Sequence, residues 1–196
     1  MPRFGEGLPR TQAAIAYAER THAGQLRGDG TPFILHPLEV ASLLFEAGAP
    51  DHLIAAGVMH DLIEKAGVTA AELTGRFGSQ ISELVRAVSD DDRIGGYGAR
   101  KAALRRQVAR AGDEALMLFA ADKLSKLREL QRDTDRDDDG TSATPPVREL
   151  RARRLRHYQR SLALLQERLP ESSLVRDLRV ELQAFVRSHR SLARAV

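Results

Sequence analysis

Apolar residues recur along most of the chain at intervals of three and four, the spacing that places them on one face of an α-helix. No stretch alternates apolar and polar residues convincingly over the length of a strand. Clusters of glycine, proline and small polar residues separate the helical segments. The pattern predicts an all-α fold. We expect one domain over residues 1–196, with a core at about 11–132 and two additional C-terminal helices at about 147–190.

Capping residues indicate where two of the expected helices begin. Thr11 and Asp51 are of residue types favoured at N-caps, so we expect a helix to start at each. The helix that follows Asp51 is predicted to run without interruption through His60 and Asp61 and to end near Gly67.

Two polar stretches predict surface loops between helices. Residues 89–98 hold three consecutive aspartates and three glycines, and this loop is long enough to form a lid. Residues 131–147 are also rich in aspartate, but they lack the spacing of an EF-hand calcium loop. We therefore expect 131–147 to be a solvated loop.

The composition is that of a soluble globular protein, with 42% apolar and 29% charged residues. The absence of cysteine excludes disulfides and zinc–cysteine sites. Residues 1–10 lack the apolar stretch of a signal peptide, and no run approaches the roughly 20 apolar residues of a membrane span. We expect a cytoplasmic protein with no membrane partner.

The formal charge of +3 comes from arginines spread over several segments, and they are densest over residues 148–160. Such a run can bind nucleic acid by neutralising phosphates, but it more often forms the solvated face of a helix. We favour the solvated face over a nucleic-acid interface.

One otherwise apolar segment, Val58–Lys65, carries an imidazole and two carboxylates. His60 and Glu64 lie about one helical turn apart, and Asp61 lies about 100° around the helix from His60. Burying three such groups without partners would cost several kcal/mol, and a divalent cation with a bound water would satisfy all three. The alternative is an ordinary surface pair of His60 and Asp61.

Another carboxylate, Asp122, follows the apolar helix face of residues 115–119. A buried aspartate is uncommon unless it is paired or coordinates a ligand. Lys123 could neutralise it from the flank, so both explanations stay open. Lys126 and Glu129, one and two turns further on, are expected to line the same groove.

A further histidine precedes Pro37, at the N-terminal edge of another expected helix. With it, separate segments offer two imidazoles and two carboxylates, namely His36, His60, Asp61 and Asp122. Nitrogen and carboxylate ligands with open positions suit manganese, iron, magnesium or zinc. Such an ion acidifies a bound water, so hydrolysis of a phosphate ester or anhydride is the natural chemistry.

Several motifs between about Ala14 and Leu130 give the chain a family resemblance. They are His22-Ala-Gly-Gln25-Leu-Arg27, Gly30–Pro37, His60-Asp61-Leu-Ile-Glu64, Phe77-Gly78 and Ala121–Leu124. At these residues the chain resembles the HD-domain metal-dependent phosphohydrolases. More narrowly, it resembles the small alarmone hydrolases and the hydrolase domain of bifunctional guanosine tetraphosphate (ppGpp) synthetase/hydrolases. Motifs in a fixed order are far more specific than one His-Asp pair.

The resemblance implies an HD-domain helical bundle in which the four ligands hold one divalent metal ion, usually manganese. It also implies that Glu64 positions or deprotonates the attacking water and that Arg27 holds the nucleotide. The family removes the 3′-pyrophosphate from ppGpp, so the expected partner is a small phosphorylated nucleotide.

Two positions depart from the family pattern. Lys65 stands where the family usually has an aspartate after the catalytic glutamate, so a candidate base is missing. Lys126 stands where a nucleotide-contacting asparagine is expected, and it would bind phosphate as a point charge. We keep Lys65 among the candidate catalytic residues and Lys126 among the substrate-binding ones. The changes leave open a weakened metal- and nucleotide-binding module, or a hydrolase of a different nucleotide.

The remaining histidines are expected to stay outside the metal set. By the resemblance, His22 makes a hydrogen bond at a helix end. His52, His157 and His189 lack convergent partners in the sequence and are interpreted as surface or core residues. A homo-oligomer is compatible with the sequence, which does not define the oligomeric state.

Overall fold

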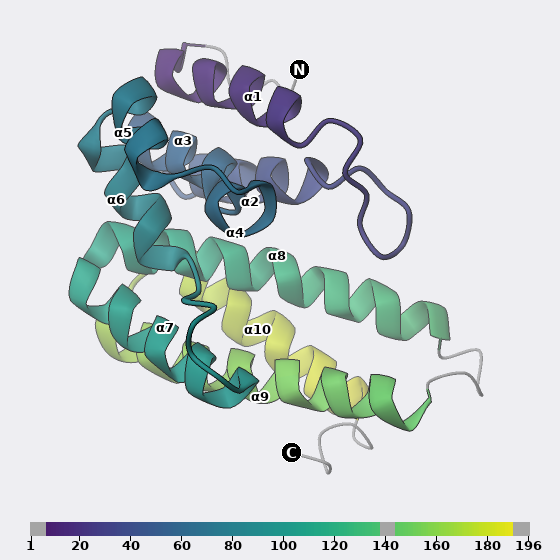
Figure 1. The fold of residues 1–196 in the computed structure, drawn as a ribbon. Coiled ribbons are helices and arrows are strands. Elements are labelled where there is room, and N and C mark those ends of the chain that lie inside the picture. Colours follow the sequence, from purple (N-terminus) through teal and green to yellow (C-terminus); the bar gives the residue numbers. More distant parts are fainter. Residues whose placement is uncertain (1–6, 138–143, 190–196) are drawn as a thin grey trace.

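The computed structural model describes residues 7–137 and 144–189, and its regular elements are all helices. Two halves lie one above the other in Figure 1, with α1 to α6 above and α7 to α10 below. In chain order the helices are α1 (Pro9–Thr21), α2 (Leu35–Glu46), α3 (Asp51–Met59), α4 (Leu62–Ala66), α5 (Ala70–Phe77), α6 (Ser79–Val88), α7 (Tyr97–Ala111), α8 (Asp113–Asp137), α9 (Pro145–Arg168) and α10 (Ser173–Ser188). The described residues form no strand, and the predicted all-α fold is confirmed.

The helix α3 is the buried centre of the upper half. Residues 53–59 are all buried, and both α1 and α2 pack against them. Gly57 allows α2 to come close, since a Cβ at this position would lie 2.7 Å from Cδ1 of Leu44 and 3.5 Å from Cα of Ala41. The first turn of α2 therefore reaches the end of α3, where Nε2 of His36 lies 3.2 Å from Nε2 of His60.

Asp51 caps a helix other than its own. Its carboxylate accepts hydrogen bonds from the backbone N–H groups of Arg10 (3.0 Å) and Thr11 (2.9 Å) and from the Thr11 hydroxyl (2.7 Å). The predicted N-cap roles are therefore wrong, because α1 begins at Pro9 and α3 follows Pro50. Asp51 instead satisfies free N–H groups at the start of α1 from the neighbouring helix.

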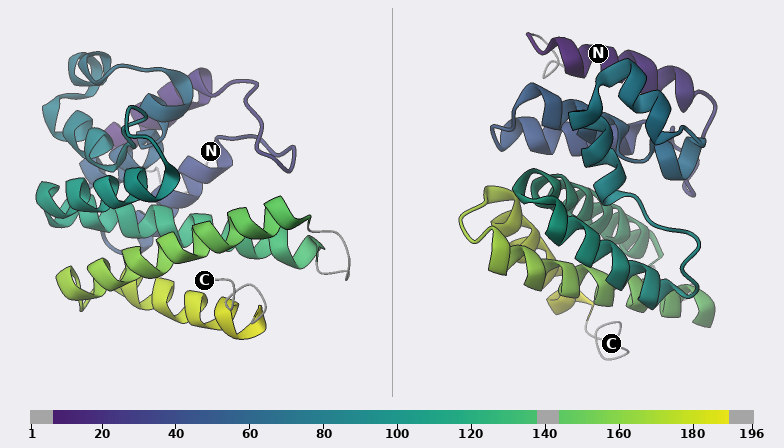
Figure 2. Two further views of the ribbon diagram at one scale, coloured as in Figure 1. Left: turned by 60° about the horizontal axis from the view of Figure 1, so that its bottom comes forward. Right: turned by 60° about the vertical axis from the view of Figure 1, so that its left-hand side comes forward.

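The long helix α8 forms the top of the lower half and packs against α2 and α3 above and α7, α9 and α10 below. The right-hand view of Figure 2 shows the two halves, one above the other, from a second side. It continues to Asp137, so the predicted loop over 131–147 begins too early. Its last turns remain helical alongside α9, where the guanidinium of Arg151 donates to the carbonyl of Asp133 (3.0 Å). Residues 138–143 of the predicted loop lie outside the described residues.

The two C-terminal helices occupy the predicted span. A stripe of buried leucines on α10 faces the core, and Arg128 of α8 forms an ion pair with Glu181 of α10 (2.7 Å). The helix α9 packs against both α7 and α8, on the side where the connection from α6 to α7 crosses between the halves (Figure 1). None of the described helices has the length and apolarity needed to cross a membrane.

Candidate metal centre and adjoining cavity

The sequence predicts one continuous helix through His60 and Asp61, but the structure has a turn at these residues. The helix α3 ends at Met59 and α4 starts at Leu62. As a result Nε2 of His60 and Oδ1 of Asp61 lie 3.4 Å apart. The prediction that one helix presents both groups is wrong, and the turn is what lets neighbouring residues face the same point.

The structure brings the four predicted ligands together from three places in the fold. His36 lies in the first turn of α2, His60 and Asp61 form the α3–α4 turn, and Asp122 lies on α8. Nε2 of His36 lies 3.2 Å from Nε2 of His60, 3.3 Å from Oδ1 of Asp122 and 3.6 Å from Oδ2 of Asp61. All four residues are at most 4% exposed. We call these four residues the HD cluster.

Hydrogen bonds on the far side of each imidazole orient the HD cluster. The hydroxyl of Ser125 donates to Glu39 (3.0 Å), so it accepts from Nδ1 of His36 (2.9 Å). Nδ1 of His60 lies 2.8 Å from the carbonyl of Gly57 and donates to it. In the neutral form of each ring, Nε2 therefore carries a lone pair toward the centre of the cluster.

The chemistry of these donors fits a divalent cation. Two imidazole lone pairs and two carboxylates converge in a buried space, where their mutual repulsion requires positive charge. Oδ1 of Asp122 is buried and faces both imidazoles, at 3.3 Å from Nε2 of His36 and 3.5 Å from Nε2 of His60. Its other close contact among the described residues is the ammonium of Lys126 at 2.8 Å. His36, His60 and Asp122 each offer one ligand atom, and these atoms lie within 4.8 Å of one another. Asp61 can complete the set.

The pKa values show how strongly the HD cluster attracts positive charge. Burial acts to lower the pKa of His60, but Asp61 and Asp122 outweigh it and raise it to about 10. Burial acts to raise the pKa values of both carboxyl groups, yet His60 beside Asp61 and Lys123 beside Asp122 hold them well below the ordinary value. Burial lowers the pKa of His36.

Two lysines of α8 form ion pairs with Asp122, each with a different carboxylate oxygen. Nζ of Lys123 contacts Oδ2 at 2.5 Å and lies 4.5 Å from the ring centre of Phe119. Nζ of Lys126 contacts Oδ1 at 2.8 Å and lies 3.8 Å from Oδ1 of Asp61. Asp122 is therefore paired with Lys123, as one of the two explanations expects, and its coordination of a metal ion stays a prediction.

A cavity of about 690 Å³ adjoins the HD cluster. Its lining includes His36 and Asp61, together with the predicted substrate and catalytic residues Arg27, Glu64, Lys65 and Lys126. The opposite wall comes from α7 and α9, which sequence reasoning did not assign to the site. The lining residues from these two helices are Tyr97, Arg100, Lys101, Arg154, His157 and Tyr158.

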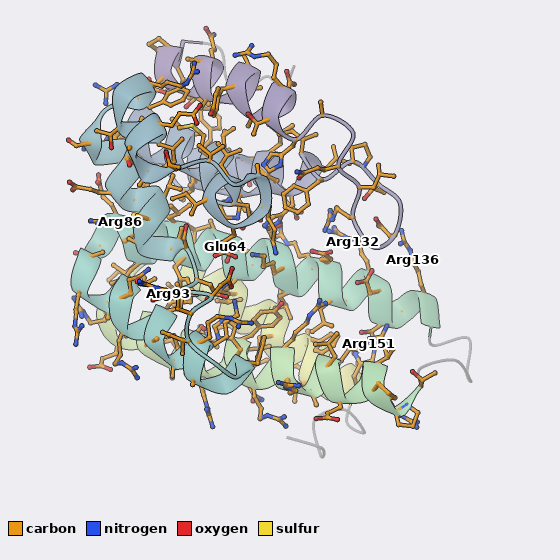
Figure 3. The ribbon with its side chains drawn as sticks, in the orientation of Figure 1. Glu64, Arg86, Arg93, Arg132, Arg136 and Arg151 are labelled. Atoms are coloured by element: carbon orange, nitrogen blue, oxygen red, sulfur yellow. The ribbon has the colours of Figure 1, made fainter. Side chains whose placement is uncertain are left out.

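Glu64 lies at the junction of the two halves, in the middle of Figure 3. Its Oε1 accepts a hydrogen bond from the backbone N–H of Asp90 (2.5 Å), which ties α4 to the loop between α6 and α7. This loop covers residues 89–96, close to its predicted extent. Lys65, which follows Glu64 in the sequence, is exposed at the edge of the cavity. Its backbone carbonyl accepts a hydrogen bond from the side chain of Gln25 (3.2 Å).

The side chain of Arg27 is only 9% exposed and is already paired. Its Nη2 lies 2.7 Å from Oε2 of Glu129, and both side chains line the cavity. A second ion pair, between Asp29 and Arg136 (3.3 Å), holds the same α1–α2 connection against α8, at the right of Figure 3. His22 at the end of α1 shares a 2.8 Å hydrogen bond with Gln25, as expected from its helix-end position.

His157 contradicts the expectation that it lacks convergent partners. It lies in the cavity wall, and its Nδ1 accepts from Nη1 of Arg105 (2.9 Å). The rings of Tyr97 and Phe119 lie 6.4 and 6.2 Å from its own. Burial, followed by the charge of Lys123, lowers its pKa to about 2, so it is neutral. The leucine spacing of α9 indicated packing, but nothing in the sequence indicated which helices α9 meets.

The other two histidines lie outside the HD cluster, as expected, although each has an acidic partner. His52 contacts Glu114 at 2.7 Å and His189 contacts Asp135 at 3.4 Å.

The arginines of residues 148–160 do not form one solvated face, and that prediction needs correction. Arg151 is only 8% exposed, and Arg154 lines the cavity. The guanidinium of Arg153 lies 5.2 Å from the ring centre of Tyr97. Part of the basic run therefore faces the candidate site rather than solvent.

A family model described as an HD domain matches residues 14–145. The chain belongs to the HD-domain family. Human guanosine-3′,5′-bis(diphosphate) 3′-pyrophosphohydrolase MESH1 is 38% identical over 135 residues, which cover 67% of this chain and 75% of the human protein. A probable GTP pyrophosphokinase of Mycobacterium leprae is 35% identical over 127 residues, which cover 63% of this chain but only 16% of that protein. The chain thus matches a small part of its long bacterial relative.

The fold of this HD-domain chain extends beyond the part that the family model matches. A solved structure of a metazoan ortholog of SpoT, described as hydrolyzing ppGpp, is similar with a TM-score of 0.73 and 22% identity. The likeness covers 92% of this chain and 95% of that one. The predicted HD-domain helical bundle is confirmed.

Proposed function

We propose that this HD-domain chain is a metal-dependent phosphohydrolase that removes the 3′-pyrophosphate from ppGpp-type alarmones. The observation that carries the proposal is the convergence of the HD cluster beside a cavity of about 690 Å³ with cationic walls. The human relative, named as a 3′-pyrophosphohydrolase of this nucleotide and 38% identical, supports the substrate.

His36, His60, Asp61 and Asp122 would hold one divalent ion, and we propose manganese as the ion used. Such an ion lowers the pKa of a bound water and neutralises charge on phosphate oxygens. Manganese is one of several divalent ions that accept mixed nitrogen and carboxylate ligands with open positions, and the resemblance to the alarmone hydrolases favours it among them. The donor set contains no sulfur, which argues against a site built for softer metals.

The residues around the HD cluster would bind and orient the nucleotide. Arg27 and Lys126 supply positive charge at the phosphates from one side, and Arg154 of α9 supplies it from the other. The rings of Tyr97 and Tyr158 in the same lining offer flat surfaces against which a base can stack. This distribution suits a ligand with separate phosphate groups and one aromatic base.

Glu64 would position the attacking water and accept its proton. One carboxylate oxygen is engaged with the N–H of Asp90, which fixes the side chain and leaves the other oxygen for this role. Lys65 cannot replace the missing aspartate as a base while it is charged, so we propose that it acts at the cavity edge by attracting phosphate.

A second candidate is a binding module that holds the metal and a nucleotide without turnover. Lys65 favours it, because this residue stands where the family pattern has an aspartate and a candidate base is therefore missing beside Glu64. The two functions differ in turnover, not in binding.

The test is release of pyrophosphate from ppGpp by the purified chain, with manganese or with EDTA, within a panel of phosphorylated nucleotides. We expect manganese-dependent conversion of ppGpp to GDP and pyrophosphate. His60→Gln should abolish it, whereas His52→Gln, at the other end of α3 and outside the cavity lining, should retain it. Failure to release pyrophosphate or phosphate from any nucleotide would reject the hydrolase, and tight nucleotide binding in that case would select the binding module.

A further inference from the structure

Lys126 occupies an unusual position beside the HD cluster. It lies one helical turn after Asp122, and its ammonium contacts Oδ1 of that carboxylate at 2.8 Å. The same oxygen lies 3.3 and 3.5 Å from Nε2 of His36 and His60. The ammonium also lies 3.8 Å from Oδ1 of Asp61. A protein cation therefore contacts the same carboxylate oxygen that a metal ion bound by the imidazoles would take.

The two lysines beside Asp122 differ in their freedom to move. The side chain of Lys123 is 4% exposed and contacts both Oδ2 of Asp122 and the ring of Phe119. The side chain of Lys126 is 31% exposed and lines the cavity. Its flexible stem allows the ammonium to leave the carboxylate for the cavity without disturbing α8. Lys123 neutralises Asp122 permanently, whereas Lys126 can exchange partners.

We propose that Lys126 couples metal binding to anion binding. When the HD cluster lacks a divalent ion, the ammonium pairs with Asp122 and Asp61. A divalent ion at the HD cluster repels the ammonium, which moves into the cavity and binds a phosphate group there. This proposal takes the metal centre from the proposed function, but it does not depend on hydrolysis.

Two consequences follow from the exchange of partners. The metal must displace an ion pair, so it binds more weakly than it would without Lys126. A phosphate in the cavity stabilises the displaced ammonium and so strengthens metal binding, and by reciprocity the metal strengthens phosphate binding. We expect each effect to be about tenfold, within the range usual for coupled sites.

The test is titration calorimetry of Mn²⁺ into the metal-free full chain, with and without inorganic phosphate, for the wild type and Lys126→Met. The variant should bind Mn²⁺ about tenfold more tightly without phosphate, and phosphate should enhance its Mn²⁺ affinity several-fold less than in the wild type. Arg76→Met removes a positive charge from another i,i+4 ion pair, with Glu72 on α5 (3.1 Å) and outside the cavity lining, and should change both quantities less than twofold. Lys126→Asn provides a second substitution at the same position, and thermal melting checks that each variant is folded.

Each result bears on the proposal. Equal Mn²⁺ affinity in the wild type and both position-126 variants would overturn it, as would equal effects of Arg76→Met and Lys126→Met. Absence of Mn²⁺ binding in all of these proteins would overturn both the coupling and the proposed function. Tighter binding in Lys126→Met without turnover of any nucleotide would support the coupling and reject the hydrolase.

Discussion

At the scale of single residues, Ser125 orients the imidazole of His36, one of the proposed metal ligands. The Ser125 hydroxyl donates to the carboxylate of Glu39 and therefore accepts a hydrogen bond from Nδ1 of His36. The carboxylate of Glu39 thus fixes the direction of both hydrogen bonds. Neither Ser125 nor Glu39 forms a recognisable metal motif in the sequence, because their role depends on α2 and α8 lying side by side.

Replacing Ser125 with alanine should weaken Mn²⁺ binding by tenfold or more, because the ring of His36 loses the partner that fixes its tautomer and orientation. Calorimetric titration measures the change. Ser42→Ala is the matched control, since that serine bonds only to Glu46 on the exposed side of α2 (3.1 Å) among the contacts described. Unchanged affinity in Ser125→Ala would show that packing alone orients the imidazole.

Arg27 gives a second prediction at this scale, since Glu129 already occupies the guanidinium that would hold a phosphate. Glu129→Gln removes the competing charge, so the KM for ppGpp should fall several-fold while kcat stays nearly constant. Steady-state kinetics measure both. Glu181→Gln breaks an Arg–Glu pair of the same 2.7 Å length on the other side of α8 and should leave KM unchanged. A raised KM in Glu129→Gln would mean that the glutamate positions Arg27 for the substrate.

At the scale of elements, the close contact of α2 with α3 sets the distance between the two imidazoles. Gly57 makes the contact possible, and Leu44, which a Cβ at 57 would strike, is fully buried. A helical glycine ordinarily costs about 1 kcal/mol of stability relative to alanine. At position 57 the packing of α2 against α3, which a larger side chain would prevent, offsets that cost.

Gly57→Ala should therefore lower the free energy of unfolding by about 1–2 kcal/mol, because strain in a packed core exceeds the gain in helix propensity. It should also weaken Mn²⁺ binding by moving α2 away from α3. Gly75→Ala in α5 is the matched control, since a Cβ there meets no atom within 4 Å, and it should stabilise the protein slightly. Urea denaturation measures both, and equal effects of the two substitutions would contradict the packing explanation.

Elements also show why sequence reasoning succeeded in some places and failed in others. The HD cluster was predictable, because polar groups inside apolar runs stand out and the motifs around them are specific. The turn at His60–Asp61, the cap that Asp51 provides to α1 and the last turns of α8 were not predictable. The cap requires α1 and α3 to lie side by side, and the last turns of α8 contact α9, which are neighbours that the sequence pattern does not reveal.

At the scale of the whole molecule, the lower half supplies a wall of the cavity and buries a neutral histidine in it. His157 lies on α9 against rings from α7 and α8, and Arg105 donates to it. Sequence periodicity gave the length of α9 but not its neighbours, so this part of the site could not be predicted. Protonating this imidazole would place a charge in the buried contact between α7, α8 and α9.

This burial makes stability depend on pH. The pKa of His157 is about 2 in the folded chain, against an ordinary value near 6.5. Below pH 6.5 the unfolded chain binds a proton that the folded chain does not, so stability falls as the pH decreases from about 6.5 toward 2. His157→Gln, which retains an acceptor for Arg105, should lose about 1 kcal/mol less than the wild type between pH 6 and pH 5. Urea denaturation at each pH measures the difference, and parallel losses would show that His157 is protonated in the folded state.

The family match ends at residue 145, where α9 begins, yet α9 contributes Arg154, His157 and Tyr158 to the cavity. The HD cluster and the far wall of the cavity thus belong to separate stretches of the chain. Under the proposed function, substitutions in α9 should change which nucleotide binds while leaving the four proposed metal ligands in place. Chimeras that exchange this one helix between relatives are the direct way to transplant selectivity without rebuilding the reactive centre.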